Sequence, residues 1–296
     1  MWNILITVLA VIILIFLWIM IYDGNRFVVR EHLFCDARIR RDCRAVVLAD
    51  LHNKKYGRDN GQLIQAIREL APDMILVAGD LLTAKPGESL DTALGVLECL
   101  SQDYPIYYGN GNHEQRIKLY PAVYGDMAER YAAGLGELGI EPLVNAHVQL
   151  MDYGIRIYGV EIDKRYYKRF GVQPMEETYL ETLLGRVDKD FYNILLAHNP
   201  DYFPQYAKWG ARLVLSGHVH GGMVRVPFVG KGVASPNIRF FPKYDGGRFD
   251  EEESTMLVSR GLGMHTIPVR LFNPGEILLL EFKTVDKQEA ANTSLS

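Results

Sequence analysis

The sequence has few cysteines, and none of them lies in a motif that binds a metal or cycles a disulfide. Its 296 residues contain three, Cys35, Cys43 and Cys99, with no CxxC pair among them. An odd number of widely spaced cysteines argues against a disulfide framework. We therefore expect three reduced, structural thiols and no structural zinc site built on thiolates.

The chain also lacks a net positive charge and an internal repeat. Lysine and arginine number 32 against 36 aspartate and glutamate residues, which gives a formal net charge of −4. A protein with this balance has no overall basic field for a nucleic-acid backbone, so we expect no nucleic-acid partner. With 48% hydrophobic residues, the chain is long and apolar enough for one large domain with a buried core.

Polar side chains are nearly absent from the first 22 residues. Residues 4–21 are apolar apart from one threonine, and about 18 residues is the shortest run that crosses the hydrocarbon core of a bilayer. Trp2, Trp18 and Tyr22 lie near its ends, where amphipathic rings favour the membrane interface. The basic start and small-residue cleavage site of a signal peptide are missing. We therefore predict an uncleaved transmembrane anchor over residues 1–22 that contacts the lipid bilayer through residues 4–21.

Basic residues lie on only one side of this run. No lysine or arginine precedes it, and a series of arginines follows it: Arg26, Arg30, Arg38, Arg40, Arg41 and Arg44. By the positive-inside rule we expect a single-pass protein of the cell membrane with its main domain in the cytoplasm. The extracytoplasmic face is the alternative.

Beyond the anchor, short apolar runs alternate with amphipathic stretches. The apolar runs predict strands at residues 26–34, 43–50, 74–80, 105–114, 155–162, 192–200, 211–218, 254–261 and 276–282. Helical periodicity predicts helices at residues 60–70, 89–100, 122–138 and 176–187. This alternation favours an α/β fold with buried, mixed sheets. We expect a connector with the first strand at 23–44, the main domain at 45–282, and a polar, disordered tail at 283–296.

Several of the predicted strands end in residues that bind metals. In open α/β sheets, ligand sites collect beyond the carboxyl ends of the strands. A single histidine after a strand is more often a satisfied polar residue than a ligand. A whole set converging on one edge is different, because buried polar groups without partners are costly. The predicted ligands are Asp50, His52, Asp80, Asn112, His198, His218 and His220.

The types of these side chains narrow the choice of metal. Carboxylates, imidazoles and one amide oxygen, without a thiolate, suit Mn, Fe, Zn, Co or Ni. The set is too large for one tetrahedral ion and fits two divalent ions that share a bridging carboxylate. Two ions about 3.5–4 Å apart are a common device for the hydrolysis of phosphate esters. We expect two divalent metal ions, with Mn²⁺ as the first choice.

The motifs D-x-H, G-D, G-N-H-E, H and G-H-x-H follow one another between Asp50 and Gly222. This ordered series resembles the calcineurin-like metallophosphoesterase superfamily. The resemblance implies a four-layer α/β/β/α sandwich of two mixed sheets and a metal-dependent phosphoric ester hydrolase. By motif, one metal would take Asp50, His52, Asp80 and His220. The other would take Asp80, Asn112, His198 and His218, so that Asp80 bridges.

Two further residues of the G-N-H-E motif receive roles from the same resemblance. His113 would face the leaving group as a general acid or a charge-stabilising donor, for which a protonated imidazole is suited. Glu114 would support the ligands from behind. In the protein Ser/Thr phosphatases of the superfamily, an acidic residue after the G-D motif would orient His113. Here Thr83 offers only a hydroxyl in that segment, which disfavours a protein phosphatase.

Two segments, Ser259–Phe282 and residues 217–228, resemble a membrane-anchored bacterial branch of the superfamily. This branch includes enzymes similar to UDP-2,3-diacylglucosamine pyrophosphatases and cell-envelope phosphoesterases, which implies a lipid-linked or envelope-related phosphate ester as substrate. Arg260 and Arg270 are candidates for phosphate contact, with structural ion pairing as the alternative. The basic, aromatic segment Asp163–Phe170 is either a cap that faces substrate or membrane, or a solvated loop.

The expected activity is hydrolysis of a phosphodiester, pyrophosphate or phosphomonoester bond by in-line attack of a metal-bridging hydroxide. A nucleotide or cyclic-nucleotide phosphodiesterase, or a nuclease, of the same superfamily is the alternative, and a nuclease would need a basic groove. A non-catalytic scaffold on the same fold is an alternative of another class. It would have no reason to keep the complete ligand set.

Overall fold

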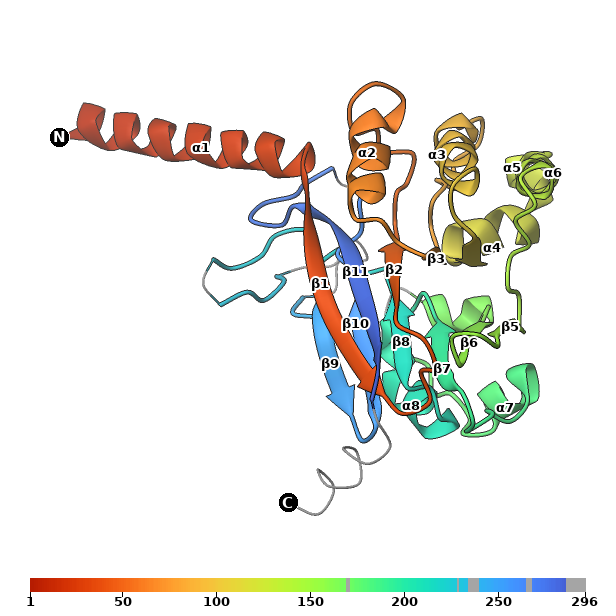
Figure 1. The fold of residues 1–296 in the computed structure, drawn as a ribbon. Coiled ribbons are helices and arrows are strands. Elements are labelled where there is room, and N and C mark those ends of the chain that lie inside the picture. The colour runs from red at the N-terminus through yellow and green to blue at the C-terminus, as the bar shows by residue number, and fades with distance from the viewer. Residues whose placement is uncertain (169–170, 228, 234–239, 265–267, 286–296) are drawn as a thin grey trace, which may run out of the picture.

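The computed structural model describes residues 1–168, 171–227, 229–233, 240–264 and 268–285. Nearly all of the predicted polar tail at 283–296 lies outside these residues. Two sheets are stacked on each other, and a long helix leads into them (Figure 1).

The two sheets are both mixed. The first has the order β1-β11-β2-β3-β4, with β1 at Phe27–Asp36, β2 at Cys43–Leu48, β3 at Met74–Ala78, β4 at Ile106–Gly109 and β11 at Gly275–Thr284. The second has the order β5-β6-β7-β8-β10-β9, with β5 at Ala146–Leu150, β6 at Ile155–Gly159, β7 at Tyr192–Leu196, β8 at Leu213–Ser216, β9 at Gly247–Glu251 and β10 at Ser254–Val258. In the first sheet β11 is parallel to β1 and antiparallel to β2, and in the second β10 is parallel to β8 and antiparallel to β9.

Alternate residues of each strand point to opposite faces of its sheet, and both faces are covered. Ala45 and Val47 of β2 pack with Ile194 of β7 and Leu215 of β8 in a core between the sheets. Their neighbours along β2, such as Val46, pack instead against helices on the outer face. The fully apolar strands follow from this double burial.

Helices cover the outer face of each sheet. The first sheet carries α2 (Gly61–Glu69), α3 (Asp91–Ser101), α4 (Asn112–Leu119), α5 (Pro121–Tyr124) and α6 (Met127–Glu137). The second carries α7 (Tyr179–Leu184) and α8 (Phe203–Trp209). Short 3₁₀ turns lie at η1 (Arg58–Asn60), η2 (Lys164–Tyr167) and η3 (Pro200–Tyr202). The predicted four-layer α/β/β/α sandwich of two mixed sheets is confirmed.

Several boundaries differ from the sequence prediction. The run at 105–114 is a strand only to Gly109, and Asn112 begins α4 instead. Helix α8 and strands β5 and β9 were not predicted. The helix expected at 122–138 is broken at Gly125, whose φ of 60° is open to glycine at little cost. The ten-residue strand β1 is an edge strand of the first sheet, where the first strand expected within the connector at 23–44 pairs with β11.

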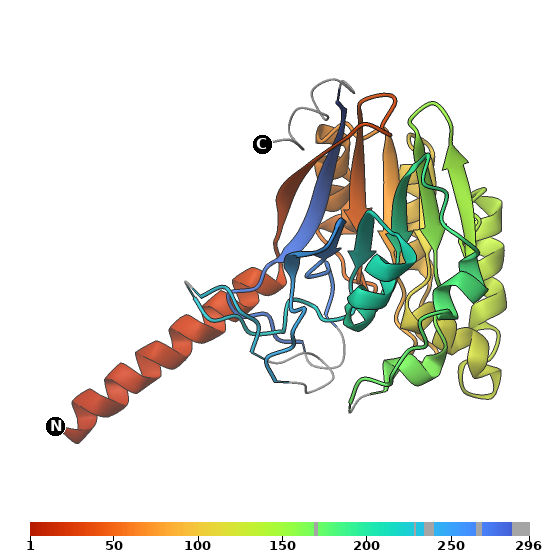
Figure 2. The same ribbon diagram turned by 90° about the horizontal axis from the view of Figure 1, so that it is seen from below.

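Helix α1 (Trp2–Gly24) projects away from the sandwich (Figure 2). It has a mean hydropathy of 3.3 over its most apolar window, none of which is buried, and by length and composition it could cross a membrane. Signal sequences pass the same test. Its end is fixed to the domain, because Asp23 is buried and accepts hydrogen bonds from Arg26 and from the backbone of Asn273.

Candidate metal centre

The predicted ligands converge at one edge of the sandwich, where five strands end. Asp50 and His52 follow β2, Asp80 follows β3, and Asn112 lies at the start of α4, after β4. His198 follows β7 in the other sheet, and His218 and His220 follow β8. The two sheets therefore contribute the two sides of a single cluster, as the shared strand ends predicted.

These side chains and His113 form three groups whose ligand atoms lie within 4.8 Å of one another, and the group of His52, Asp80 and His113 joins the other two. The Asp50 group consists of Asp50, His52 and His220, and the Asp80 group consists of Asp80, His198 and His218. In the first, His220 Nε2 lies 3.4 Å from Asp50 Oδ1 and 3.2 Å from His52 Nε2. In the second, His198 Nε2 lies 3.1 Å from Asp80 Oδ2.

The residues present fit a pair of divalent cations. The side-chain oxygen Oδ1 of Asn112 is buried next to the Asp80 group and has no hydrogen-bond partner among the residues that the structure describes. Two buried carboxylates and several imidazole nitrogens face the same space, which is the donor set of Mn, Fe or Zn sites. Most of the ligands are also held in the left-handed backbone region, at a cost of about 1–3 kcal/mol each. Those with positive φ are Asp50 (49°), His52 (46°), Asp80 (57°), His218 (71°) and His220 (52°).

Glycines let the backbone approach the two carboxylates. A Cβ atom on Gly111 would collide with Asp80 Oδ1, and one on Gly217 would collide with Asp50 Oδ2. No side chain larger than hydrogen is compatible with either position unless the carboxylate moves. The glycines of the motifs therefore serve to pack the ligands tightly.

Burial and charge affect the two carboxylates in opposite ways. Burial raises the pKa of Asp50 to about 7. The charge of His198 opposes this rise, and the carboxylate of Asp80 adds to it. Burial also acts to raise the pKa of Asp80, but the imidazoles around it, His198 first, hold this pKa well below its usual range. Burial alone would lower the pKa of His198, yet the two carboxylates raise it to about 10. Protons on Asp50 and His198 thus occupy positions that a cation would take.

His113 lies beside the cluster with its two ring nitrogens in different surroundings. Its Nε2 is 3.9 Å from Asp80 Oδ2, and its Nδ1 accepts a hydrogen bond of 2.7 Å from the backbone N–H of Ala84. A nitrogen that accepts from an N–H group carries no proton itself. The segment after Asp80 therefore orients His113 through the backbone of Ala84. Because Nδ1 accepts this bond, the proton of a neutral ring lies on Nε2, the nitrogen nearer Asp80.

Glu114 lies behind the ligands, as the sequence predicted. Its buried carboxylate accepts hydrogen bonds from the backbone N–H groups of Asp80, Leu81 and Gly111 and from the hydroxyl of Tyr108. Burial, together with the charge of Asp80, raises the pKa of Glu114 to about 7, although the backbone donors oppose the rise. Glu114 therefore fixes the turns on which Asp80 and the start of α4 depend.

Arg270 and Arg260 are placed as supporting residues. Arg270 is 2% exposed, and its guanidinium donates to the backbone carbonyls of Gly261 and Gly263, beside Asp50. Arg260 is partly buried and lies 3.5 Å from the carboxylate of Glu276. These contacts favour the structural alternative over direct contact with a phosphate.

Sequence reasoning missed two residues behind His220. Asn273 donates from its side chain to the backbone oxygen of His220, while its own backbone N–H donates to Asp23. In the sequence, the only sign that Asp23 has a role is its position as a carboxylate at the end of an apolar run. No sequence pattern indicates a role for Asn273. The two link α1 directly to a predicted ligand.

The segment Asp163–Phe170 faces the cluster through Tyr167. The Tyr167 ring meets the His218 ring edge-on at 5.3 Å. Its neighbours Lys164 and Lys168 are exposed, and Phe170 lies outside the described residues. Of the two alternatives for this segment, the cap that faces the site agrees with the position of Tyr167.

Comparison with known proteins agrees with a phosphoesterase site built on this cluster. The family model of calcineurin-like phosphoesterases matches residues 43–222. An uncharacterized metallophosphoesterase of Campylobacter jejuni is 27% identical over 252 residues, which are 83% of this chain and 60% of that protein. A UDP-2,3-diacylglucosamine pyrophosphatase of Chlamydia muridarum is 23% identical over 286 residues, covering 80% of this chain and 82% of its own. A phosphodiesterase of Escherichia coli is 25% identical over 236 residues, covering 79% and 80%.

Proposed function

This chain belongs to the calcineurin-like phosphoesterase family, whose members hydrolyse phosphoesters, and we propose that it is a membrane-anchored dinuclear enzyme acting on a lipid-linked phosphate ester. The observation that carries the proposal is the double cluster at the strand ends. The Asp50 group is buried, and the Asp80 group, which adjoins it through His52, is partly open at His218.

The roles within the cluster follow from its two groups. One ion would be held by Asp50, His52 and His220 with Asp80, and the other by Asp80, His198, His218 and Asn112. Divalent ions there, with Mn²⁺ the first choice, would supply an activated water and neutralise charge on the phosphoryl oxygens.

The residues around the cluster have their own tasks. Glu114 and Ala84 hold Asp80 and His113 in position through backbone contacts. His113 would donate a hydrogen bond from Nε2 to the leaving oxygen, which favours departure by stabilising developing charge. A neutral imidazole suits this donor role and has no second proton to give.

The attachment of α1 supports a position at the membrane. Only two residues separate Gly24 from β1, and the buried Asp23 ties the end of α1 to Asn273. The Phe272 ring packs edge-on against Phe16 at 6.2 Å. Phe16 precedes Gly24 by eight residues, so this contact lies about 12 Å along the helix. If α1 spans a bilayer, Phe272 lies at the depth where interfacial apolar side chains insert.

Exposed apolar side chains gather in the loop that leads from His220 to β9. Val229, Phe240 and Phe241 are each at least 65% exposed. This loop lies on the side of the domain from which α1 projects (Figure 2). The metal centre would then be close to the lipid surface, which favours a substrate carried by lipid. The Chlamydia relative is named as a UDP-2,3-diacylglucosamine pyrophosphatase, which agrees with this class. The arginines after α1 favour the cytoplasmic face.

The test uses the full-length chain in lipid nanodiscs with added Mn²⁺ and bis-p-nitrophenyl phosphate as a general diester. We expect two bound ions by elemental analysis. Asp80→Asn should reduce hydrolysis on the order of 10³-fold, because a shared ligand stabilises several kcal/mol of charge. Asp59→Asn is the matched control, since Asp59 has a φ of 50° but an exposed side chain outside the cluster.

Full metal-dependent activity of Asp80→Asn would disprove the catalytic assignment. Absence of bound metal in the unaltered protein would favour the non-catalytic scaffold instead.

A further inference from the structure

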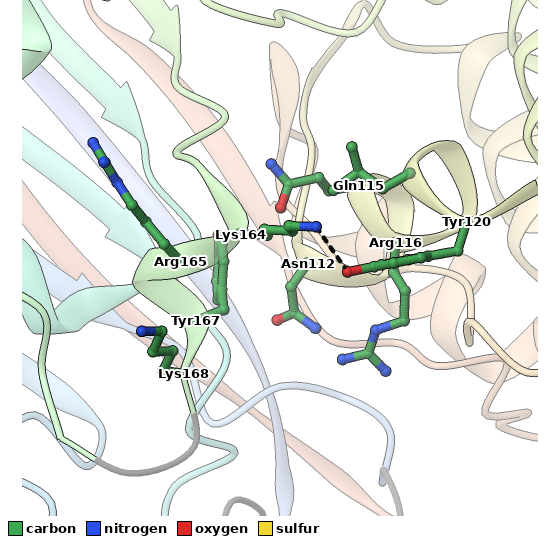
Figure 3. A pocket seen from close by; sticks show the side chains of 9 residues that line it. Asn112, Gln115, Arg116, Tyr120, Lys164, Arg165, Tyr167 and Lys168 are labelled. Atoms are coloured by element: carbon green, nitrogen blue, oxygen red, sulfur yellow. Dashed lines mark hydrogen bonds between the residues drawn. The ribbon is translucent and has the colours of Figure 1, made fainter.

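A cavity of about 390 Å³ lies beside the Asp80 group, between α4 and the turn η2 (Figure 3). Arg116 and Tyr120 line it from the side of α4, and Lys164, Tyr167 and Lys168 line it from the other side. The function proposed above leaves this cavity without an assigned role.

The cavity has a strongly one-sided charge. Its lining includes four basic residues and no acidic one. Over the ranges that the structure describes, no ion pair involves Arg116, Lys164 or Lys168. Lys164 Nζ is held 3.2 Å from the hydroxyl of Tyr120, so it has a neutral partner only. Cations gathered around a cavity without counter-charges repel one another unless an anion enters.

The fourth basic residue is directed elsewhere. Arg165 extends away from the cavity in Figure 3, and its guanidinium donates to the hydroxyl of Tyr166 at 3.0 Å. It nevertheless lines the cavity together with Lys164 and Lys168, so a control must come from a basic residue outside the lining.

The cavity continues into the metal centre. Asn112, whose Oδ1 has no partner, lines the cavity from the start of α4, and Arg116 follows one helical turn later. The Tyr167 ring forms part of the wall and also contacts His218. A group attached to a phosphate at the Asp80 group would enter this space first.

We propose that this cavity binds a second phosphate of the substrate, next to the one that is cleaved, so that the substrate class is a diphosphate diester. The inference rests on the proposed function. Metal ions at the cluster would neutralise the charge of the phosphate that is cleaved. The basic side chains of the cavity therefore suit a second anionic group. Arginine can hold a phosphate through two hydrogen bonds, and lysine adds a mobile point charge. The volume exceeds that of one phosphate and admits part of the group it carries, against Leu119 and the tyrosines.

In this reaction the oxygen of water bonds to the phosphorus at the cluster. The bond from that phosphorus to the bridging oxygen breaks, and the second phosphate leaves with the bridging oxygen and the bonding electrons. One proton of the water passes to solvent. Arg116 and Lys168 stabilise the leaving phosphate, which gains negative charge.

The first experiment compares three substrates on the full-length chain in nanodiscs with Mn²⁺. Bis-p-nitrophenyl phosphate has one phosphate, a soluble uridine diphosphate sugar has two, and cytidine diphosphate diacylglycerol has two and is carried by the bilayer. The variant is Arg116→Ala with Lys168→Ala. We expect the ratio of kcat/KM for a diphosphate to kcat/KM for bis-p-nitrophenyl phosphate to fall on the order of 30-fold. Arg186→Ala, which removes an exposed arginine paired with Glu181 outside the cavity, should leave the ratio unchanged, and Arg116→Lys in place of Arg116→Ala should restore part of it.

The second experiment measures binding without catalysis. Titration of the full chain, freed of metal by chelation, with the α,β-methylene analogue of uridine diphosphate should give a Kd that rises at least about tenfold in the double variant. If the ratio of kcat/KM values falls only for the bilayer-borne diphosphate, or only for the soluble one, the result identifies the source of the ligand. Both of these outcomes support the proposal. An unchanged ratio, or an equal fall for all three substrates, overturns it. Binding that persists in an unaltered chain without phosphoesterase activity refutes the proposed function and leaves the cavity assignment standing.

Discussion

The two halves of the metal centre are built from the same kinds of side chain but open in different directions. The Asp50 group is closed: Asp50, His52 and His220 are at most 6% exposed, and loops from the C-terminal part of the chain back them. The Asp80 group is open on one side, where His218 is only partly buried and Asn112 faces the cationic cavity.

The difference separates two tasks. Behind the Asp50 group, Asn273 connects His220 to Asp23 at the end of α1. Beside the Asp80 group, Tyr167 connects His218 to the cavity lining. One half is thus linked to α1 and the other to the cavity beside α4, and the following predictions test that division.

Removal of one ligand from each half should have the largest effect. His220→Ala and His218→Ala should each lower the bound Mn²⁺ from two ions to one and reduce hydrolysis on the order of 10³-fold. His220→Ala should also destabilise the fold, because its ring stacks on His52 at 4.9 Å in a buried position. Elemental analysis, steady-state rates and thermal unfolding check these outcomes. His147→Ala, on an exposed histidine of β5, is the control. Retention of both ions in either variant would remove the basis for two separate sites.

Truncation of the link to α1 should act on one half alone. Asn273→Ala removes the donor to the His220 carbonyl, and loss of such a supporting contact weakens metal affinity by about 10–100-fold. We expect this loss for one of the two ions only. Tyr167→Phe on the other side keeps the ring contact with His218 and should change neither affinity by more than about threefold. Metal titration of both variants decides the matter, and equal weakening of both ions by Asn273→Ala would show that the halves are not independent.

The convergence of the candidate ligands could be predicted from the sequence because they follow five strands that end at one edge of the sandwich. Asp50, Asp80 and His198 are local features of apolar runs, and parallel strands bring their carboxyl ends together without further information. The sandwich follows for the same reason, since fully apolar strands need cover on both faces. No long-range contact had to be known.

The supporting contacts could not be predicted, because they join distant or featureless positions. The bond from Asn273 to Asp23 spans 250 residues. The donor to His113 is a backbone N–H at Ala84, which has no side-chain signature. Helix α4 was missed because its polar sequence lacks an apolar stripe, although Glu114 accepting from Gly111 is a recognisable start signal. With α4 recognised, Arg116 would have been placed one turn after Asn112.

The smallest effect expected is a difference in how the two halves respond to pH. In the metal-free chain, Asp50 has a pKa raised to about 7, so it is mostly protonated at pH 6 and mostly ionised at pH 8. His198, with a pKa of about 10, is protonated at both. Binding of Mn²⁺ must displace these protons, and it should therefore release about one proton more per chain at pH 6 than at pH 8. Below pH 7 the affinity of the Asp50 group should fall about tenfold per pH unit. Calorimetry in two buffers of different ionisation enthalpy measures the release. In Asp50→Asn the difference between pH 6 and pH 8 should vanish, whereas a persistent difference would assign the titration to another group and leave Asp50 ionised throughout.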